Sequence, residues 1–233
     1  MKVKLVVLGL TLLLSVAAVN AQRIPATGLC NTGLTPGGPL PLGCLGSTPV
    51  TPVNPDTGGP SVDGNWQLAA PYPSVTESQQ GPNPCALTHF GPAWVDTPDP
   101  GWLNPNDGLS QWITPQVLSP TTAGGWYVYR TAFPAPPVQT GASKYILSVT
   151  GRVLADDLVP AIFLASTDDG PLGCRLVSLP AMPADFSFAS WSPFSFEVAI
   201  EPGSQVYLYA NVYNVLPSQT GLRIEITSAY FTP

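Results

Sequence analysis

The chain has 233 residues, of which 44% are apolar and only 9% are charged, and its formal net charge is −6. So much apolar material with so little charge excludes a disordered chain and is enough for a sizeable core. The acidic balance disfavours nucleic acid and anionic lipid as partners.

Residues 1–21 have the features of a secretory signal peptide. Lys2 and Lys4 precede an apolar run that starts at Leu5, and small residues lead to Ala21. The run is too short to span a bilayer comfortably and ends at an A-x-A-like site, which favours a cleaved leader over a membrane anchor. Cleavage would leave six basic and fourteen acidic residues, a formal charge of −8. We therefore expect a secreted protein with no membrane attachment after cleavage.

Residues 22–60 have the composition of a linker or stalk. They are rich in Thr, Gly and Pro and hold few large apolar side chains. Such a composition is typical of an extended spacer. We expect residues 61–233 to form a single folded domain, since a body of this size does not require two.

The four cysteines are expected to form two disulfides, because an exported chain meets an oxidising compartment. Four cysteines allow three pairings, so the sequence leaves the connectivity open. Cys30 and Cys44 lie in one segment, whereas Cys85 and Cys174 lie in another. We favour the pairs Cys30–Cys44 and Cys85–Cys174.

The folded part is predicted to consist of short strands, because 29 prolines and 22 glycines disfavour long helices. Residues 62–120 hold four of the six tryptophans but only one strand-like stretch, near Trp112 and Ile113, so we expect long loops there. Further strands are predicted at 125–133, 144–150, 161–165, 194–200, 205–213 and 222–227. Their spacing, with Gly, Pro and Asp turns, predicts an all-β fold, an antiparallel β-sandwich.

The last three predicted strands alternate between two faces. Apolar residues of 194–200 and 222–227 occupy one face of each strand. In 205–213 the second face carries Tyr207, Tyr209, Asn211 and Tyr213, so that face is amphipathic. We interpret these tyrosines as a candidate binding surface or as a contact face for a partner.

Several short strings occur in an order that is similar to one family. They are Asp63-Gly-Asn-Trp66, Pro92-Ala-Trp-Val95, Trp102-Leu-Asn104, Ser110-Gln-Trp-Ile113, Tyr127-Val-Tyr-Arg-Thr-Ala-Phe133, Gly151-Arg-Val-Leu-Ala-Asp-Asp157 and Thr220-Gly-Leu-Arg223. Together they resemble the galactose-binding-like jelly-roll module of secreted bacterial proteins, including PEP-CTERM-type exoproteins and the non-catalytic sandwich of family 2 glycoside hydrolases. The resemblance implies a sandwich used for binding or as an accessory module, without a catalytic centre.

Two features depart from that family. Asp156-Asp157 stands where the family usually has Asp-Asn, and Leu164-Ala-Ser166 stands where it usually has Leu-Asn-Gly. No hydrophobic tail follows the last predicted strand before Pro233, so we do not expect a PEP-CTERM sorting anchor.

Exposed aromatic rings are the first candidate ligand site, since sugar-binding sandwiches stack flat rings against pyranoses while polar side chains bond the hydroxyls. The candidates are Trp94, Trp102, Asn104, Trp112 and Trp126. For each tryptophan the competing interpretation is a core plug that holds a loop down.

Acidic residues give the second set of candidates. Asp156 and Asp157 could bind a structural Ca²⁺, which accepts hard oxygen ligands, although we favour ordinary turn chemistry as their explanation. We expect Arg130, inside a predicted strand, to pair with one of these two carboxylates. Asp63 is expected to cap a turn and Trp66 to plug the end of the sandwich.

Catalysis is not expected. His89 is the one histidine and lies beside no strong base motif, and neither G-x-S-x-G nor H-E-x-x-H occurs. A hydrolase using Asp96 and Asp107 is a weak alternative, since nothing positions them as a pair.

The sequence therefore predicts a secreted, non-catalytic binding module for an extracellular glycan or matrix component. The alternative is a structural subunit of an extracellular or cell-surface assembly, whose tyrosine face and N-terminal segment mediate self-association or contacts with a protein partner.

Overall fold

The computed structural model of the chain describes residues 22–34, 60–72, 81–96, 102, 109–116, 122–139, 142–167, 173–180 and 188–233. The expected signal peptide and residues 35–59 of the expected linker lie outside this described part. Both therefore stay predictions.

The described elements are strands, apart from one short 3₁₀ helix. The strands are β1 (Ile24–Pro25), β2 (Val62–Tyr72), β3 (Gly91–Val95), β4 (Ile113–Thr114), β5 (Gly125–Pro134), β6 (Tyr145–Asp156), β7 (Leu158–Ser166), β8 (Arg175–Ser178), β9 (Ser192–Ile200), β10 (Gln205–Asn214) and β11 (Gly221–Thr232), and the 3₁₀ helix is η1 (Pro84–Ala86). The all-β prediction is confirmed.

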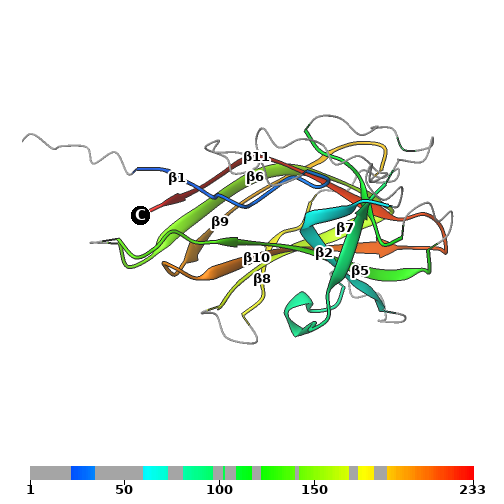
Figure 1. The fold of residues 1–233 in the computed structure, drawn as a ribbon, viewed down its shortest axis with the longest axis horizontal. Helices are drawn as coiled ribbons and strands as arrows, with labels where there is room; N and C mark the ends of the chain where they lie inside the picture. Colours follow the sequence, from blue (N-terminus) through cyan, green and yellow to red (C-terminus); the bar gives the residue numbers. More distant parts are fainter. Residues whose placement is uncertain are drawn as a thin grey trace, which may run out of the picture.

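The strands form an antiparallel sandwich of two layers that is nearly closed into a barrel. Their order is β8-β7-β10-β5-β2-β3-β4-β11-β6-β9, and β1 pairs with β11. Figure 1 shows β6, β9 and β11 on one side of the molecule and β5, β7 and β10 on the other. The short strands β3 and β4 join the layers along one side. Along the other side, the Arg175 guanidinium of β8 donates to the Ala199 carbonyl of β9 over 3.1 Å.

Strand alternation produces the core between the layers. In β10 the residues Val206, Leu208, Ala210 and Val212 are buried, and in β11 Leu222, Ile224 and Ile226 are buried opposite them. In β9 the expected inward face is buried as well. Burial of each Val, Leu or Ile side chain contributes about 1.5–3 kcal/mol, which explains why these strands follow their hydrophobic pattern.

Two strands in the first half of the domain, β2 and β3, are not predicted from the sequence, which indicates one strand-like stretch there, near Trp112 and Ile113. β2 spans eleven residues and pairs with β3 and β5. Its sequence contains Asp63, Gly64, Asn65 and Pro71, which are depleted in strands. The pairing also shifts register between Val62 and Gln67 and again after Ala69, and such bulges break the two-residue period.

The beginning of the expected linker belongs to the folded body. Ile24 pairs with Phe231 in β11, and Ala26, Leu29 and Leu34 are buried. The Asn31 carboxamide oxygen accepts from the Ile226 amide over 2.6 Å. Residues 22–34 therefore differ from the predicted extended spacer, because scattered apolar residues and side-chain hydrogen bonds are enough to dock them on β11.

Candidate functional site

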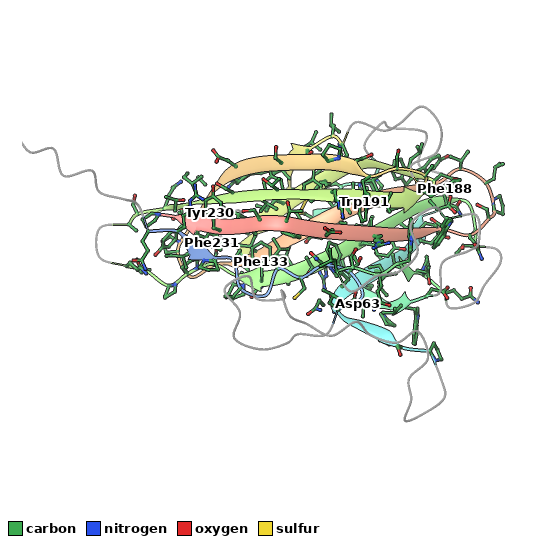
Figure 2. The ribbon with its side chains drawn as sticks, turned by 90° about the horizontal axis from the view of Figure 1, so that it is seen from above. Asp63, Phe133, Phe188, Trp191, Tyr230 and Phe231 are labelled. Carbon is green, nitrogen blue, oxygen red and sulfur yellow. A yellow bond between two sulfur atoms is a disulfide. The ribbon has the colours of Figure 1, made fainter. Side chains whose placement is uncertain are left out.

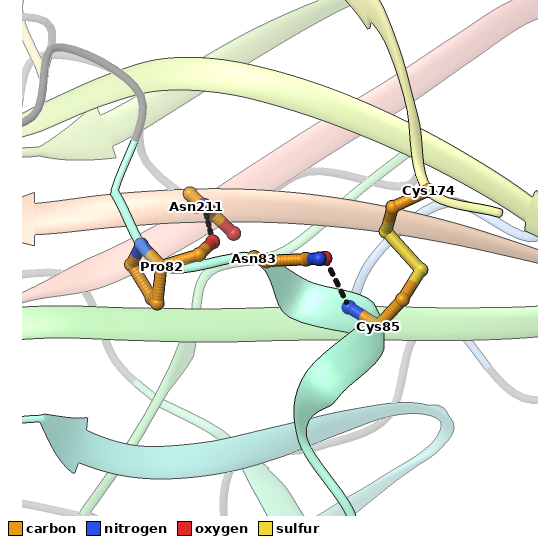
Figure 3. The surroundings of a disulfide bond; sticks show 5 residues. All are labelled: Pro82, Asn83, Cys85, Cys174 and Asn211. Carbon is orange, nitrogen blue, oxygen red and sulfur yellow. Dashed lines mark hydrogen bonds between the residues drawn. A yellow bond between two sulfur atoms is a disulfide. The ribbon is translucent and has the colours of Figure 1, made fainter. Parts of the chain in front are cut away.

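The segment of residues 81–90 lies across the outer face of β10 and is tied down at several points. A disulfide joins Cys85 to Cys174 with a Cα–Cα distance of 5.7 Å, which confirms that predicted pair. The Asn83 side chain accepts from the Cys85 amide over 3.0 Å, and the Asn211 carboxamide donates to the Pro82 carbonyl over 2.9 Å (Figure 3). The other predicted bridge includes Cys44, which lies outside the described residues.

This segment covers the tyrosine face predicted on 205–213. The Phe90 ring lies 6.2 Å from the Tyr209 ring, and Tyr209 is buried. Burial raises the pKa of Tyr209, with the nearby Arg130 acting against that rise. The chain itself therefore covers Tyr209, whereas Tyr207 and Tyr213 on the same face stay partly exposed.

Arg130 does not pair with Asp156 or Asp157, so that prediction is wrong. Its guanidinium carbon lies 3.8 Å from the Phe90 ring centre, and its Nε donates to the Gln67 side chain over 2.9 Å. Arg130 lies on β5, in the layer opposite β6. On the outer face its guanidinium packs against an aromatic ring and donates to a neutral amide.

Trp94 lines a surface hollow of about 390 Å³, which we call the Trp94 hollow. Its walls are Leu68, His89, Phe90, Gly91, Pro92, Trp94 and Pro115. Strand β3 alternates there, with Ala93 and Val95 turned into the core and the Trp94 ring outward and partly exposed. The volume falls within the range of small-ligand pockets.

His89 adds a polar group to this apolar hollow. The side chain is exposed, and its Nδ1 lies 2.8 Å from the Thr88 hydroxyl. The sequence did not indicate that His89 and Phe90 would stand beside Trp94. The predicted Cys85–Cys174 pair ties this segment to the residue before β8. The sequence alone did not give the strand order that brings His89 and Phe90 beside Trp94.

Trp102 and Trp112 are buried and belong to a separate apolar cluster. Their rings are 4.1 Å apart, and they pack with Leu154, Phe188 and Trp191 on the outer face of β6. Asn104, the neighbouring candidate, lies outside the described residues. For these two tryptophans the structure agrees with the core-plug interpretation, so neither is a ligand platform.

Trp126 is buried as well. Its ring packs 4.7 Å from the Tyr213 ring, at the edge of the segment that starts at Gly81. Of the four candidate tryptophans, Trp94 is thus the one with a partly exposed ring.

The two carboxylates considered for calcium act as hydrogen-bond acceptors where the chain passes from β6 to β7. Asp156 accepts from the Trp102 indole over 2.7 Å, and Asp157 accepts from the Val215 amide over 2.8 Å. Within the described residues there is no group of three or more His, Cys, Asp or Glu side chains that could hold a metal ion. The geometry assigns both carboxylates a role in fixing loops.

Asp63 and Trp66 hold the N-terminal segment against β2. The Asp63 carboxylate accepts from the Asn65 and Trp66 amides, as a turn cap does, and also from the Gly33 amide over 2.6 Å. The Trp66 indole donates to the Cys30 carbonyl over 3.0 Å. Burial raises the pKa of Asp63 to about 6, and the three amide hydrogen bonds oppose that rise. Asp63 caps a turn as the sequence predicted, and Trp66 is fully buried in the core.

Two further observations bear on where the protein works. The Cys85–Cys174 disulfide is compatible with an extracellular protein. Across the described residues, no helix has both the length and the apolar character needed to cross a membrane.

The comparisons with known proteins identify no relative. No protein-family model matches the chain, and no curated protein matches it significantly. The resemblance to the galactose-binding-like module therefore stays a hypothesis, and the case for function depends on the chain's own residues.

Proposed function

We propose that this chain is a secreted, non-catalytic binding module whose ligand is an extracellular glycan or matrix component, held at the Trp94 hollow. One observation carries the proposal: a partly exposed indole forms the wall of a hollow of about 390 Å³. The apolar faces of sugar rings stack on such rings, and this interaction needs no charge.

The rest of the hollow is consistent with a neutral ligand. Phe90, Pro92 and Pro115 give it apolar walls, and His89 can hydrogen-bond a hydroxyl. With Nδ1 engaged by Thr88, Nε2 is the ring nitrogen through which His89 would meet a ligand. The lining residues in the described part of the chain include no carboxylate. A binding role suits this set better than general acid–base chemistry, which usually recruits a carboxylate or a second base.

The test is retention of the purified chain on a panel of immobilised neutral polysaccharides. We expect Trp94→Ala to weaken binding by about two- to tenfold, since a stacked ring contributes about 0.5–1.5 kcal/mol. Trp94→Phe should retain part of the affinity. Val138→Ala changes an exposed apolar residue outside the hollow and is the matched control. If every polysaccharide fails to retain the wild-type chain, or if Trp94→Ala binds as the wild type does, the proposal is wrong.

A further inference from the structure

The outer face of the layer formed by β11, β6 and β9 is divided into two halves. Figure 2 looks onto this face, with Phe188 and Trp191 toward one end and Tyr230 toward the other. At the first end the aromatic cluster of Trp102, Trp112 and Trp191 covers the strands. At the Tyr230 end the face is hollowed and polar.

Two rows of directly opposed residues cross the three strands in this polar half. The first row is Tyr230, Ser148 and Glu197, and the second is Ser228, Thr150 and Ser195. Directly opposed residues of antiparallel strands have Cβ atoms about 4.5–5.5 Å apart. Neighbours such as Leu147, Val149 and Phe196 point into the core, so the six side chains share the outward face. Ser148 is largely covered there, and the other five side chains are partly or fully exposed.

The first row is ordered by contacts at both ends. The Ser148 hydroxyl donates to the Glu197 carboxylate over 2.9 Å, which holds the carboxylate over the face. At the other end the exposed Arg23 lies with its guanidinium carbon 4.3 Å from the Tyr230 ring centre. Arg23 comes just before β1, and the pairing of β1 with β11 places it there.

These side chains line a hollow of about 380 Å³, which we call the hydroxyl groove. The hydroxyls of Thr150, Ser195 and Ser228 can each donate and accept, Glu197 accepts, and Arg23 donates. The one positive and one negative charge balance each other, which favours a neutral ligand. An anionic ligand would meet Glu197 and a chain of net charge −6. A peptide would need pockets for apolar side chains, whereas the outward side chains here are polar.

We propose that the hydroxyl groove is a second binding site, specific for a neutral oligosaccharide, in which Glu197 and the hydroxyls of Thr150 and Ser195 bond successive sugar hydroxyls. This inference shares the ligand class of the proposed function but not its site. The Trp94 hollow is built on β2, β3 and the 81–90 segment, whereas the groove is built on β11, β6 and β9. A chain with both sites would bind a long polysaccharide more tightly than either site alone.

The test is residue-level mapping by NMR of amide shifts in the full chain, titrated with neutral tetrasaccharides of glucose, mannose and galactose. We expect amides in both rows to shift. The double variant Thr150→Val/Glu197→Gln keeps side-chain volume but removes a hydroxyl and a charge, and it should weaken binding at the groove by about tenfold. Thr27→Val removes an exposed hydroxyl outside the groove and serves as the control. Unchanged thermal midpoints would show that the variants fold.

The titration distinguishes failure of the Trp94 hollow from failure of the hydroxyl groove. Shifts confined to the Trp94 hollow, abolished by Trp94→Ala and unaffected by the double variant, would overturn the groove and support the hollow. Shifts in the two rows that survive Trp94→Ala support the groove whatever happens at the hollow. If none of the tetrasaccharides shifts any amide, both are wrong.

Discussion

The Asp63 carboxylate accepts the amide of Gly33, thirty residues earlier in the chain, over 2.6 Å in a buried environment. This hydrogen bond ties the N-terminal segment to β2. The same carboxylate also accepts from two amides of its own strand, so one side chain shapes a local turn and fixes a distant segment.

The raised pKa of Asp63 predicts a pH dependence of stability. The pKa of an aspartate is ordinarily 3.8, the value expected in the unfolded chain, whereas that of Asp63 in the fold is about 6. The folded chain therefore binds the proton more tightly than the unfolded chain. The free energy of unfolding should therefore fall as pH rises from about 4 to about 6, by about 3 kcal/mol in total from this group. Urea unfolding of the wild type and of Asp63→Asn across this window isolates the effect, because the variant lacks the titrating carboxyl group. If the free energy of unfolding changes with pH by the same amount in both proteins, the prediction is wrong.

Loss of the Cys85–Cys174 disulfide should destabilise the chain and expose the 81–90 segment. The bridge closes a loop with a sequence separation of 89 residues. Removing such a cross-link costs about 4 kcal/mol through the entropy of the unfolded chain. The variant Cys85→Ser/Cys174→Ser should unfold at lower urea, and limited proteolysis should cut near Phe90 before the body of the sandwich. An unchanged midpoint with an unchanged cleavage pattern would show that the other contacts of this segment are sufficient.

Gly81 and Gly203 form a matched pair for testing how tightly the same segment packs. Both have a positive φ, +75° and +77°. A Cβ on Gly81 would lie 2.6 Å from the Trp126 ring, whereas a Cβ on Gly203 would meet nothing within 4 Å. Gly203→Ala should cost about 1–2 kcal/mol from the left-handed backbone alone. Gly81→Ala should cost about 1–3 kcal/mol more from overpacking. Thermal unfolding measures the difference, and equal losses would argue against close contact with Trp126.

Asp156 is predicted to matter as a hydrogen-bond acceptor. Asp156→Ala would leave the buried Trp102 indole without its acceptor, at a cost of about 1–3 kcal/mol. Asp156→Asn retains an acceptor oxygen and should lose less. Denaturant unfolding of the two variants tests this order. Addition of calcium to the wild type and to Asp156→Asn is the companion measurement, and a rise in the thermal midpoint of the wild type alone would show that a cation uses this carboxylate.

The sequence predicted the fold best where strands have a regular two-residue period. Val206, Leu208, Ala210 and Val212 lie in the core because each alternates with a residue of the opposite face. It failed for β2, where bulges and residues such as Gly64 and Asn65 interrupt the pattern while pairing with β5 and β3 still holds the strand. The sequence of a single strand does not show which distant strands pair with it.

The candidate site was predictable in part. Trp94 and Trp102 both lie in proline-rich sequence, yet Trp94 is partly exposed and Trp102 is buried. The two residues differ in their contacts. Trp102 packs on Trp112 and donates to Asp156, whereas the Trp94 side chain points outward from β3. The polar rows of the hydroxyl groove depend on the registers of β11, β6 and β9, which no single strand sequence contains.

The pairing of β1 with β11 has a consequence for how the chain folds. Figure 1 places β1 beside β11, near the C-terminus. The hydrogen bond from Ile226 to Asn31 closes a separation of 195 residues. Contacts of such long range give a high contact order, which slows folding. During synthesis β1 cannot pair until β11 has emerged, so β1 is among the last parts of the molecule to become ordered.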